Sequence, residues 1–200
     1  NNPECELHEL MEVLPGPDFP TGGVICGRQG ILDAYATGRG RLIVRGRITA
    51  EEEKEGRWAL IVEEIPYPPR RDLIIERIAE LGKEGVLPGI ARLDDFADRT
   101  NPYRIHIQLK KGEDPQVTEN LLYQHTPLQE TFGVNAIALV NGRPETLGLV
   151  ELLRNYRDYR IDVIRRRTRF LLKKAEDRLH IVDGLRIAVD NIDEVVRIIR

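Results

Sequence analysis

The sequence predicts an α+β fold, with a mixed or antiparallel sheet and flanking helices, followed by a long coiled-coil helix. Two observations lead to this prediction. Up to about residue 147, segments of helical periodicity and segments of strand periodicity alternate irregularly, as they do in α+β domains. No proline follows Pro144, and the remaining residues are mostly leucine, isoleucine, valine, arginine and aspartate, a composition suited to one long solvated helix.

Two short helices are expected near the start of the chain. Residues 4–14 carry apolar side chains on one helical face, and the prolines and glycines of residues 15–23 end this helix. Residues 27–38 predict the second helix, with Gly38 as its C-cap. The apolar residues of the two faces are Leu7, Leu10, Met11 and Leu14 in the first helix and Ile31, Leu32 and Tyr35 in the second.

A hairpin is expected next. Residues 41–48 and 57–65 are rich in β-forming residues and flank the acidic segment 49–56, which should form a solvated, mobile tip. The proline-rich segment 66–69 ends the second strand, because proline cannot donate a hydrogen bond to a sheet.

The middle of the chain predicts two helices, two strands and one further hairpin. In residues 103–110 the apolar side chains alternate with polar ones, which is typical of a strand with one buried face. Asp114 is the expected N-cap of the second helix, and Asn141-Gly142 is the expected hairpin turn. The helices are expected at 71–85 and 114–124, the strands at 89–96 and 103–110, and the hairpin at 132–149.

The segment from about residue 148 to the end predicts one long helix with an apolar seam. Apolar side chains recur in alternating steps of three and four residues, as in a coiled coil, interrupted by Thr168 and Arg178 and weakened at Gly184. Because the seam still runs at Arg200, its partner helix is expected outside this chain. The seam consists of Ile164, Thr168, Leu171, Ala175, Arg178, Val182, Leu185, Val189, Ile192, Val196 and Ile199.

Composition excludes several classes of protein. The 200 residues are 41% hydrophobic, which is enough for one good-sized core, and no run of apolar residues is long enough for a membrane span. The N-terminus lacks the features of a signal peptide, so a cytoplasmic location is expected, with Cys5 and Cys26 as reduced thiols. The chain begins with Asn-Asn and not with Met, which suggests a piece of a longer protein.

The basic residues gather in two zones although the formal net charge is −3. The first zone runs from Arg28 to Arg47 and contains five arginines with Asp33 as its one acid, and the second runs from Arg154 to Arg178. Such zones on a mildly acidic chain suggest a polyanion held in a defined place. For the second zone there is also the interpretation that its arginines solubilise the helix and pair with a partner's acids.

The stretch TGRGRLIVRGR, residues 37–47, contains the glycines of a phosphate loop but not its order. A nucleotide-binding loop requires a strand, then the glycines, then a helix, whereas here a helix precedes the glycines and a strand follows them. In a regular strand, Arg41, Arg45 and Arg47 would share one face, with Arg39 at the turn. This row of guanidinium groups suits contacts with phosphates, although a merely solvated sheet face is an equally good interpretation.

No catalytic residue and no metal ligand is predicted. His8, His106, His125 and His180 are scattered, and none sits in a nucleophile motif. The acidic cluster 94–98 lacks the spacing of a calcium loop and is interpreted as a solvated turn. Trp58 and the six tyrosines are expected to pack in sheets and cores.

Five sequence segments together carry a resemblance to one family. They are GPDFPTGG, GILDAYATGRG, EIPY, LYQHTPLQETFGVNAIALVNGRP and the run from VIRRRTRF to the C-terminus, in this order along nearly the whole chain. The sequence resembles the A subunit of bacterial type IIA DNA topoisomerases, that is, of DNA gyrase or its paralogue topoisomerase IV, with gyrase favoured. A local departure is Pro68-Pro69, where the family commonly has glutamine and a small or apolar residue.

The resemblance implies a domain organisation. Residues 1–23 would be the exit from the winged-helix region, residues 24–147 the tower domain, and residues 148–200 the proximal coiled-coil helix. The family cuts both strands of a DNA duplex through a tyrosine, passes a second duplex and reseals the first. It is driven by ATP, which with Mg²⁺ is bound by the B subunit, so no cofactor is expected in this chain.

The resemblance also implies what this chain does in the family's reaction. The family's nucleophilic tyrosine lies in an arginine-tyrosine-threonine context that no tyrosine of this chain has, so the chain should hold double-stranded DNA without cutting it. The implied partners are the phosphate backbone of the bent gate duplex, a second A subunit in a homodimer, and a gyrase B-type subunit. No association with a membrane is implied. The implied DNA-binding residues are Arg28, Arg39, Arg41, Arg45 and Arg47.

An alternative function from another class is a structural module without catalytic activity. Its arginines would serve protein contacts, and its long helix would exist to dimerise.

Overall fold

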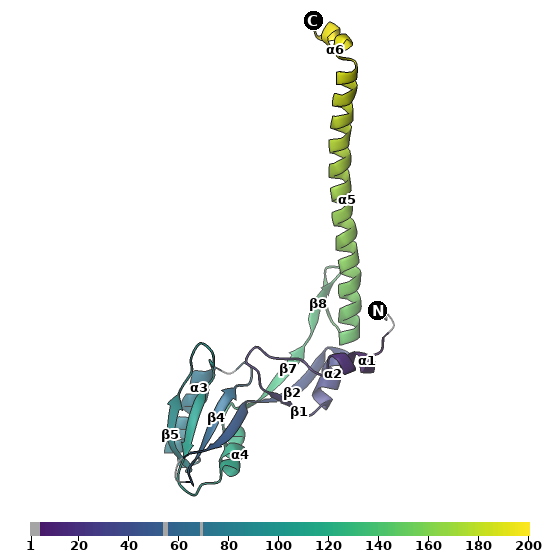
Figure 1. Cartoon of the computed structure of the whole chain (residues 1–200). Coiled ribbons are helices and arrows are strands. Elements are labelled where there is room, and N and C mark those ends of the chain that lie inside the picture. The colour runs from purple at the N-terminus through teal and green to yellow at the C-terminus, as the bar shows by residue number, and fades with distance from the viewer. Residues whose placement is uncertain (1–4, 54–55, 69) are drawn as a thin grey trace. The chain divides into compact units, whose positions relative to one another are not determined.

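The computed structural model describes residues 5–53, 56–68 and 70–200 of the chain. It divides into two compact units, the first ending at Glu151 and the second comprising Leu152–Arg200. Within the described residues there are six helices and nine strands (Figure 1). The helices are α1 (Leu7–Val13), α2 (Gln29–Thr37), α3 (Arg71–Lys83), α4 (Pro115–His125), α5 (Leu149–Asp190) and α6 (Ile192–Ile199).

The strands of the first unit form antiparallel sheets, so the expected α+β class is confirmed. A three-stranded sheet has the order β1-β2-β7, a four-stranded sheet the order β3-β4-β6-β5, and β8 and β9 form a hairpin. The strands are β1 (Val24–Cys26), β2 (Arg39–Arg45), β3 (Arg47–Glu52), β4 (Trp58–Glu64), β5 (Ile90–Asp95), β6 (Ile105–Leu109), β7 (Gln129–Asn135), β8 (Ile137–Val140) and β9 (Arg143–Thr146).

The chain changes sheets at Gly46. A hairpin of β3 and β4 is present, but its first strand was predicted wrongly: residues 49–52, expected in the tip, pair with β4, and the segment before Gly46 leaves this sheet and pairs as β2 with β7. A Cβ atom at position 46 would lie 2.7 Å from the carbonyl oxygen of Glu64, so the change of sheet occurs where only a glycine fits between the strands. Lys54 and Glu55, in the expected tip of the hairpin, and Pro69 of the Pro68-Pro69 departure lie outside the described residues.

The larger core lies on one face of the four-stranded sheet. α3 and α4 cover this face, and the alternation predicted for residues 103–110 places Ile105, Ile107 and Leu109 in it, fully buried. The helices contribute Ile74, Ile78, Leu81 and Leu122.

A smaller core lies between α1, α2 and the three-stranded sheet. It contains Met11, Ile31, Tyr35, Leu42 and Val44. Three expected members of the helical faces lie outside it: Leu10, Leu14, which is the exposed C-cap of α1, and Leu32, which is 40% exposed. Short turns and caps follow the sequence: Gly38 ends α2 with φ 74°, and Asp114 accepts a hydrogen bond from the Gln116 N–H at 2.8 Å.

The long helix is continuous through Gly184 but not to the end of the chain. α5 ends at Asp190, and Asn191, with φ −121° and ψ 34°, separates it from α6. The side-chain amide of Asn191 donates to the carbonyl oxygen of Ile187 at 2.9 Å, a local bond that competes with helix continuation. The prediction of one uninterrupted helix is therefore wrong at Asn191. Among the helices of the described residues, none is both long and apolar enough to cross a membrane.

Candidate nucleic-acid interface

The alternation of β2 separates its arginines from its apolar residues. Leu42 and Val44 are buried, at 1% and 0% exposure, and Gly40 faces α2 on the same side. Arg39, Arg41, Ile43 and Arg45 lie exposed on the other side. The sequence prediction of an arginine face on this strand is therefore confirmed for β2.

The neighbouring strand β7 completes the exposed side of the sheet. In the antiparallel register, Asn135 lies opposite Arg39, Gly133 opposite Arg41 and Gln129 opposite Arg45. A Cβ atom at position 133 would meet nothing within 4 Å, and Gly133 places no side chain directly across from Arg41. We call this surface the open face. None of its side chains is acidic, although Asp33 of α2 lines a hollow beside it. The face is formed by Arg39, Arg41, Ile43, Arg45, Gln129, Thr131, Gly133 and Asn135.

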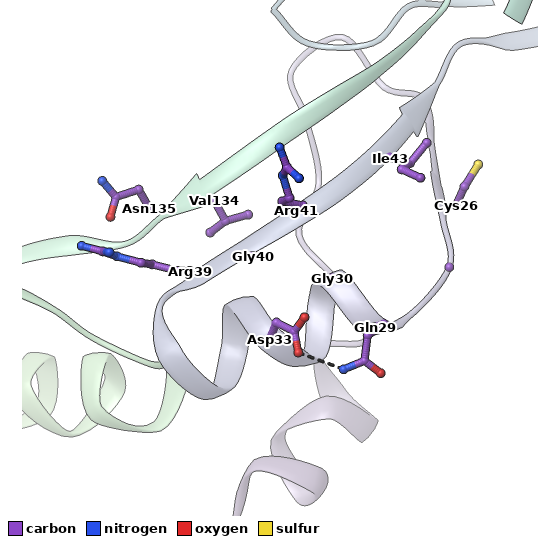
Figure 2. A pocket seen from close by; sticks show the side chains of 11 residues that line it. Cys26, Gln29, Gly30, Asp33, Arg39, Gly40, Arg41, Ile43, Val134 and Asn135 are labelled. Atoms are coloured by element: carbon purple, nitrogen blue, oxygen red, sulfur yellow. Dashed lines mark hydrogen bonds between the residues drawn. The ribbon is translucent and has the colours of Figure 1, made fainter. Parts of the chain in front are cut away.

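A hollow of about 850 Å³ lies at the Arg39 end of β2. β1 pairs only with residues 43–45 of β2, so the part of β2 before Ile43 has a free edge, beside which α2 lies. Figure 2 shows Arg39 and Arg41 on β2, with Asn135 of β7 on one side and Gln29 and Asp33 of α2 on the other. The carboxylate of Asp33 accepts a hydrogen bond from Gln29 Nε2 at 2.9 Å (Figure 2).

The arginines of the open face differ in how firmly they are held. Arg45 Nε donates to Gln129 Oε1 at 2.6 Å, and its guanidinium lies 4.8 Å from the centre of the Tyr123 ring. Arg39 and Arg41 form no ion pair with any described residue. A phosphate oxygen could therefore bind to Arg39 and Arg41 without first displacing a carboxylate.

Arg47 does not belong to the open face. It lies on β3, in the other sheet, and its Nε is 3.2 Å from Glu64 Oε1. The other oxygen of Glu64 accepts a hydrogen bond from the Gly23 N–H at 2.6 Å, so this carboxylate of β4 joins the loop before β1 to Arg47 of β3. The predicted row Arg41, Arg45 and Arg47 is thus wrong in its last member, because Gly46 ends the strand between them.

Arg28 lies apart from the other four arginines. It is the N-cap of α2 and lines a different hollow, of about 360 Å³, together with His8, Met11, Glu12 and Leu32. The structure thus brings together Arg39, Arg41 and Arg45 of the five residues expected to bind DNA, and leaves Arg28 and Arg47 elsewhere.

The polar residues of β7 and the position of Tyr123 were missed from the sequence. The segment Gln129–Asn135 alternates between polar or small residues and larger ones, which is the strand signal that could have found it. Residues 132–135 were instead assigned to the following hairpin. Tyr123 donates its hydroxyl proton to the carbonyl oxygen of Gly46 at 2.8 Å and so supports the point where the chain changes sheets.

His106 and the acidic cluster contact other residues of the chain. His106 Nε2 lies 3.1 Å from Glu53 Oε1. Asp98 Oδ1 accepts hydrogen bonds from the N–H groups of Asn101 and Thr100, each at 2.6 Å, which lower the pKa of this carboxyl and close a turn. In the part of the chain that the structure describes, no group of three or more His, Cys, Asp or Glu side chains could hold a metal ion.

The position of Tyr123 predicts a loss of stability at alkaline pH. Burial, followed by the neighbouring charge of Glu119, raises the pKa of Tyr123 to about 12, compared with about 10 in an unfolded chain. Above pH 10 the unfolded state releases this proton while the folded state keeps it, so the free energy of unfolding should fall as the pH rises from 10 toward 12. Urea unfolding at pH 9, 10 and 11 measures this slope.

Tyr123→Phe should flatten that part of the pH dependence, whereas Tyr159→Phe, at a position 61% exposed, should leave it as in the parent chain. Equal slopes for the Tyr123→Phe variant and the parent would show that the Tyr123 hydroxyl does not contribute.

Comparison with known proteins gives a family match over the whole chain. Residues 1–200 match the model of the family described as the A subunit of DNA gyrase/topoisomerase IV. The chain is 49% identical over 201 residues to the probable chloroplastic/mitochondrial DNA gyrase A subunit of Oryza sativa subsp. japonica. It is 49% identical over 199 residues to the DNA gyrase A subunit of Halalkalibacterium halodurans and 47% identical over 200 residues to that of Clostridium acetobutylicum.

The match covers all of this chain but only part of each relative. The chain spans 21% of the length of the rice protein and 24% of the length of each of these two bacterial proteins.

Proposed function

The chain belongs to the family of the DNA gyrase/topoisomerase IV A subunits, and from this premise we propose that its open face binds the phosphate backbone of double-stranded DNA. The observation that carries the proposal is the pair Arg39 and Arg41, which are exposed and form no ion pair with the described residues. The carboxylate that lines their hollow, Asp33, is hydrogen-bonded to Gln29. Guanidinium groups bind phosphate oxygens in bidentate geometry, and such contacts position a duplex without reading its sequence.

In the intact protein, we propose that this surface supports the bent gate duplex of a type IIA topoisomerase. Bending a duplex of 20–30 base pairs by 40–90° costs about 1–6 kcal/mol, which several arginine–phosphate contacts could offset. Because no tyrosine of this chain lies between arginine and threonine, the chain alone is proposed to bind DNA without cleaving it. The proposed partners of the intact protein remain a gyrase B-type subunit, with its ATP and Mg²⁺, and a second copy of the intact protein.

The cellular location stays a prediction for this chain. A cytoplasmic location is expected from the sequence, whereas the name of the rice relative is qualified as chloroplastic/mitochondrial.

Replacing Arg39 and Arg41 together by glutamine should weaken duplex binding and make it less dependent on salt. Each phosphate contact that is lost should reduce the slope of log affinity against log salt concentration by about 0.9, so the double variant should lose about 2 in slope. Fluorescence anisotropy with two labelled duplexes of unrelated sequence, over a series of salt concentrations, measures the slope. The loss should be the same for both duplexes, because backbone contacts carry no sequence information.

The matched control is the double variant Arg99→Gln and Arg104→Gln, which removes two exposed arginines of the other sheet region. The control should keep the slope of the parent chain. A parental slope in the Arg39 and Arg41 double variant would contradict the role of the open face.

The structural module is kept as a second candidate function because the seam of α5 is exposed in this chain. Ile164, Val182 and Leu185 are 55%, 44% and 62% exposed, as expected of a helix that pairs with another. Sedimentation with and without a DNA duplex separates the two functions. A stable dimer whose mass does not change on addition of DNA would favour the structural module over the DNA-binding function.

A further inference from the structure

The charged residues of α5 are distributed unevenly around the helix. A helix has 3.6 residues per turn, so residues seven positions apart lie on nearly the same side, about 10.5 Å apart along the axis. Arg160, Arg167 and Lys174 follow this spacing. We call them the basic stripe. The nearest acidic side chain of α5 is Asp177, three residues after Lys174 and about 60° from it around the helix, a spacing at which side chains can meet, but the two form no ion pair.

The basic stripe has no acidic partner among the described residues. All three side chains are exposed. Ion pairs of α5 lie elsewhere on the helix: Arg166 Nε is 2.9 Å from Asp162 Oδ2, and Arg157 Nε is 2.9 Å from Asp158 Oδ1. The three cations of the stripe are therefore not neutralised by a carboxylate of the part of the chain that the structure describes.

The basic stripe runs along one flank of the apolar seam. Arg167 and Lys174 directly precede the seam positions Thr168 and Ala175, and Arg160 precedes Ile161, one heptad before Thr168. In coiled coils this flank makes interhelical salt bridges. The first question is therefore whether a second copy of α5 could neutralise the stripe.

A second copy of α5 does not provide the acids. In a parallel pair, a residue of this flank faces the residue five positions further along the partner, which here is Arg165, Leu172 or Leu179. In an antiparallel pair the same flanks meet, so arginine would face arginine or lysine. Neither arrangement places a carboxylate against the stripe.

We propose that the basic stripe binds the phosphate backbone of a double-stranded nucleic acid, at a surface separate from the open face. From Arg160 to Lys174 the stripe extends about 21 Å, since each residue adds about 1.5 Å. A duplex carries about one negative charge per 1.7 Å of its axis, so a segment of this length presents a dense row of phosphates to three cations. Tyr156, four residues before Arg160 and 61% exposed, adds a hydroxyl donor at the N-terminal end of the stripe.

The test compares two triple variants of the 200-residue chain that each remove three positive charges from the same helix. The first is Arg160→Gln, Arg167→Gln and Lys174→Gln. The second, the matched control, is Arg165→Gln, Arg169→Gln and Lys173→Gln, whose exposed side chains point to other sides of α5. Glutamine is nearly as good a helix former as arginine and lysine, so both variants should keep the helix, which circular dichroism checks.

Each triple variant is made in the parent chain and in the double variant with Arg39→Gln and Arg41→Gln. Binding of a labelled duplex of about 20 base pairs is then measured against salt concentration. The stripe variant should lose about 2 to 3 in the slope of log affinity against log salt in either background, and the control variant less than about 1. The two proposals fail separately: an unchanged slope on loss of Arg39 and Arg41 counts against the open face only.

Two results would overturn the proposal for the stripe. One is an equal loss of slope in both triple variants, which would mean that only the total charge of the helix matters. The other is unchanged duplex binding in the stripe variant, including the case in which its sedimentation changes, which would assign the stripe to a contact between protein helices.

Discussion

Gly30→Ala is expected to destabilise the first unit by about 3 kcal/mol or more, the upper end of what overpacking costs. A Cβ atom at position 30 would overlap the carbonyl oxygen of Arg41 and lie 2.8 Å from its carbonyl carbon. Both are backbone atoms of β2, so no rotation of a side chain can relieve the overlap. The helix α2 would have to move away from the sheet, which would open the smaller core around Leu42 and Val44.

The contact between α2 and β2 is tight from both sides. A Cβ atom at Gly40 would lie 2.8 Å from the Cβ of Ala34 and would overlap the carbonyl oxygen of Gly30. The two glycines therefore set the distance between α2 and the strand that carries Arg39 and Arg41. We expect the Gly30→Ala variant to lose affinity for duplex DNA as well as stability.

Gly82→Ala is the matched control for Gly30→Ala. Gly82 also lies within a helix, α3, but a Cβ atom there would meet nothing within 4 Å. Since alanine is favoured over glycine in a helix by about 0.8–1.0 kcal/mol, this variant should be as stable as the parent or more so. Urea unfolding followed by circular dichroism measures both. Equal midpoints for the two variants would contradict the tight contact.

Ile107→Ala is expected to cost about 2–5 kcal/mol of the free energy of unfolding. Ile107 is fully buried at 0% exposure, in a strand that lies between β4 and β5, opposite Leu60 on one side and Leu93 on the other. Truncation to alanine removes three carbon atoms and leaves a cavity that the surrounding sheet can fill only in part. Equilibrium unfolding in urea measures the change.

Two further variants calibrate the Ile107→Ala result. Ile107→Val removes one methylene group and should cost about 0.5–1.5 kcal/mol. Val117→Ala, on the exposed side of α4 at 57% exposure, should change stability by no more than about 0.5 kcal/mol. A loss in Val117→Ala as large as that in Ile107→Ala would contradict the assignment of the core.

Together, the Gly30→Ala and Ile107→Ala variants show whether the two cores unfold as one. They belong to different hydrophobic clusters, yet the residues up to Glu151 form a single compact unit. If the unit is cooperative, both variants shift the same unfolding transition. Two separate transitions would mean that the sheets on either side of Gly46 are independently stable.

Much of the local structure followed from residues a few positions apart. The left-handed conformation of Gly38 at the end of α2, the N-cap Asp114 and the turn at Asn141 and Gly142 all depend on short-range chemistry of the backbone. The same holds for the buried alternation of β6 and for the exposed arginines of β2. The break at Asn191 was missed because the seam pattern continues on both sides of it.

The partners of the strands could not be read in the same way. β2 pairs with β7, where Arg45 faces Gln129, 84 residues further along the chain. β1, only three residues long, was not anticipated at all. The periodicity of a strand shows which side of it is buried, but not which other strand of similar composition lies beside it.

The sequence alone determined the α+β class, the family and the exposed side of each arginine in β2, because these depend on composition, motif order and a period of two residues. Only the tertiary structure decided which arginines act together. Gly46 sends Arg47 into another sheet, where Glu64 holds it, while the pairing with β7 places Gln129 beside Arg45 and no side chain directly across from Arg41. These arrangements depend on the approach of backbones far apart in the sequence, and that approach is set by the packing of the cores.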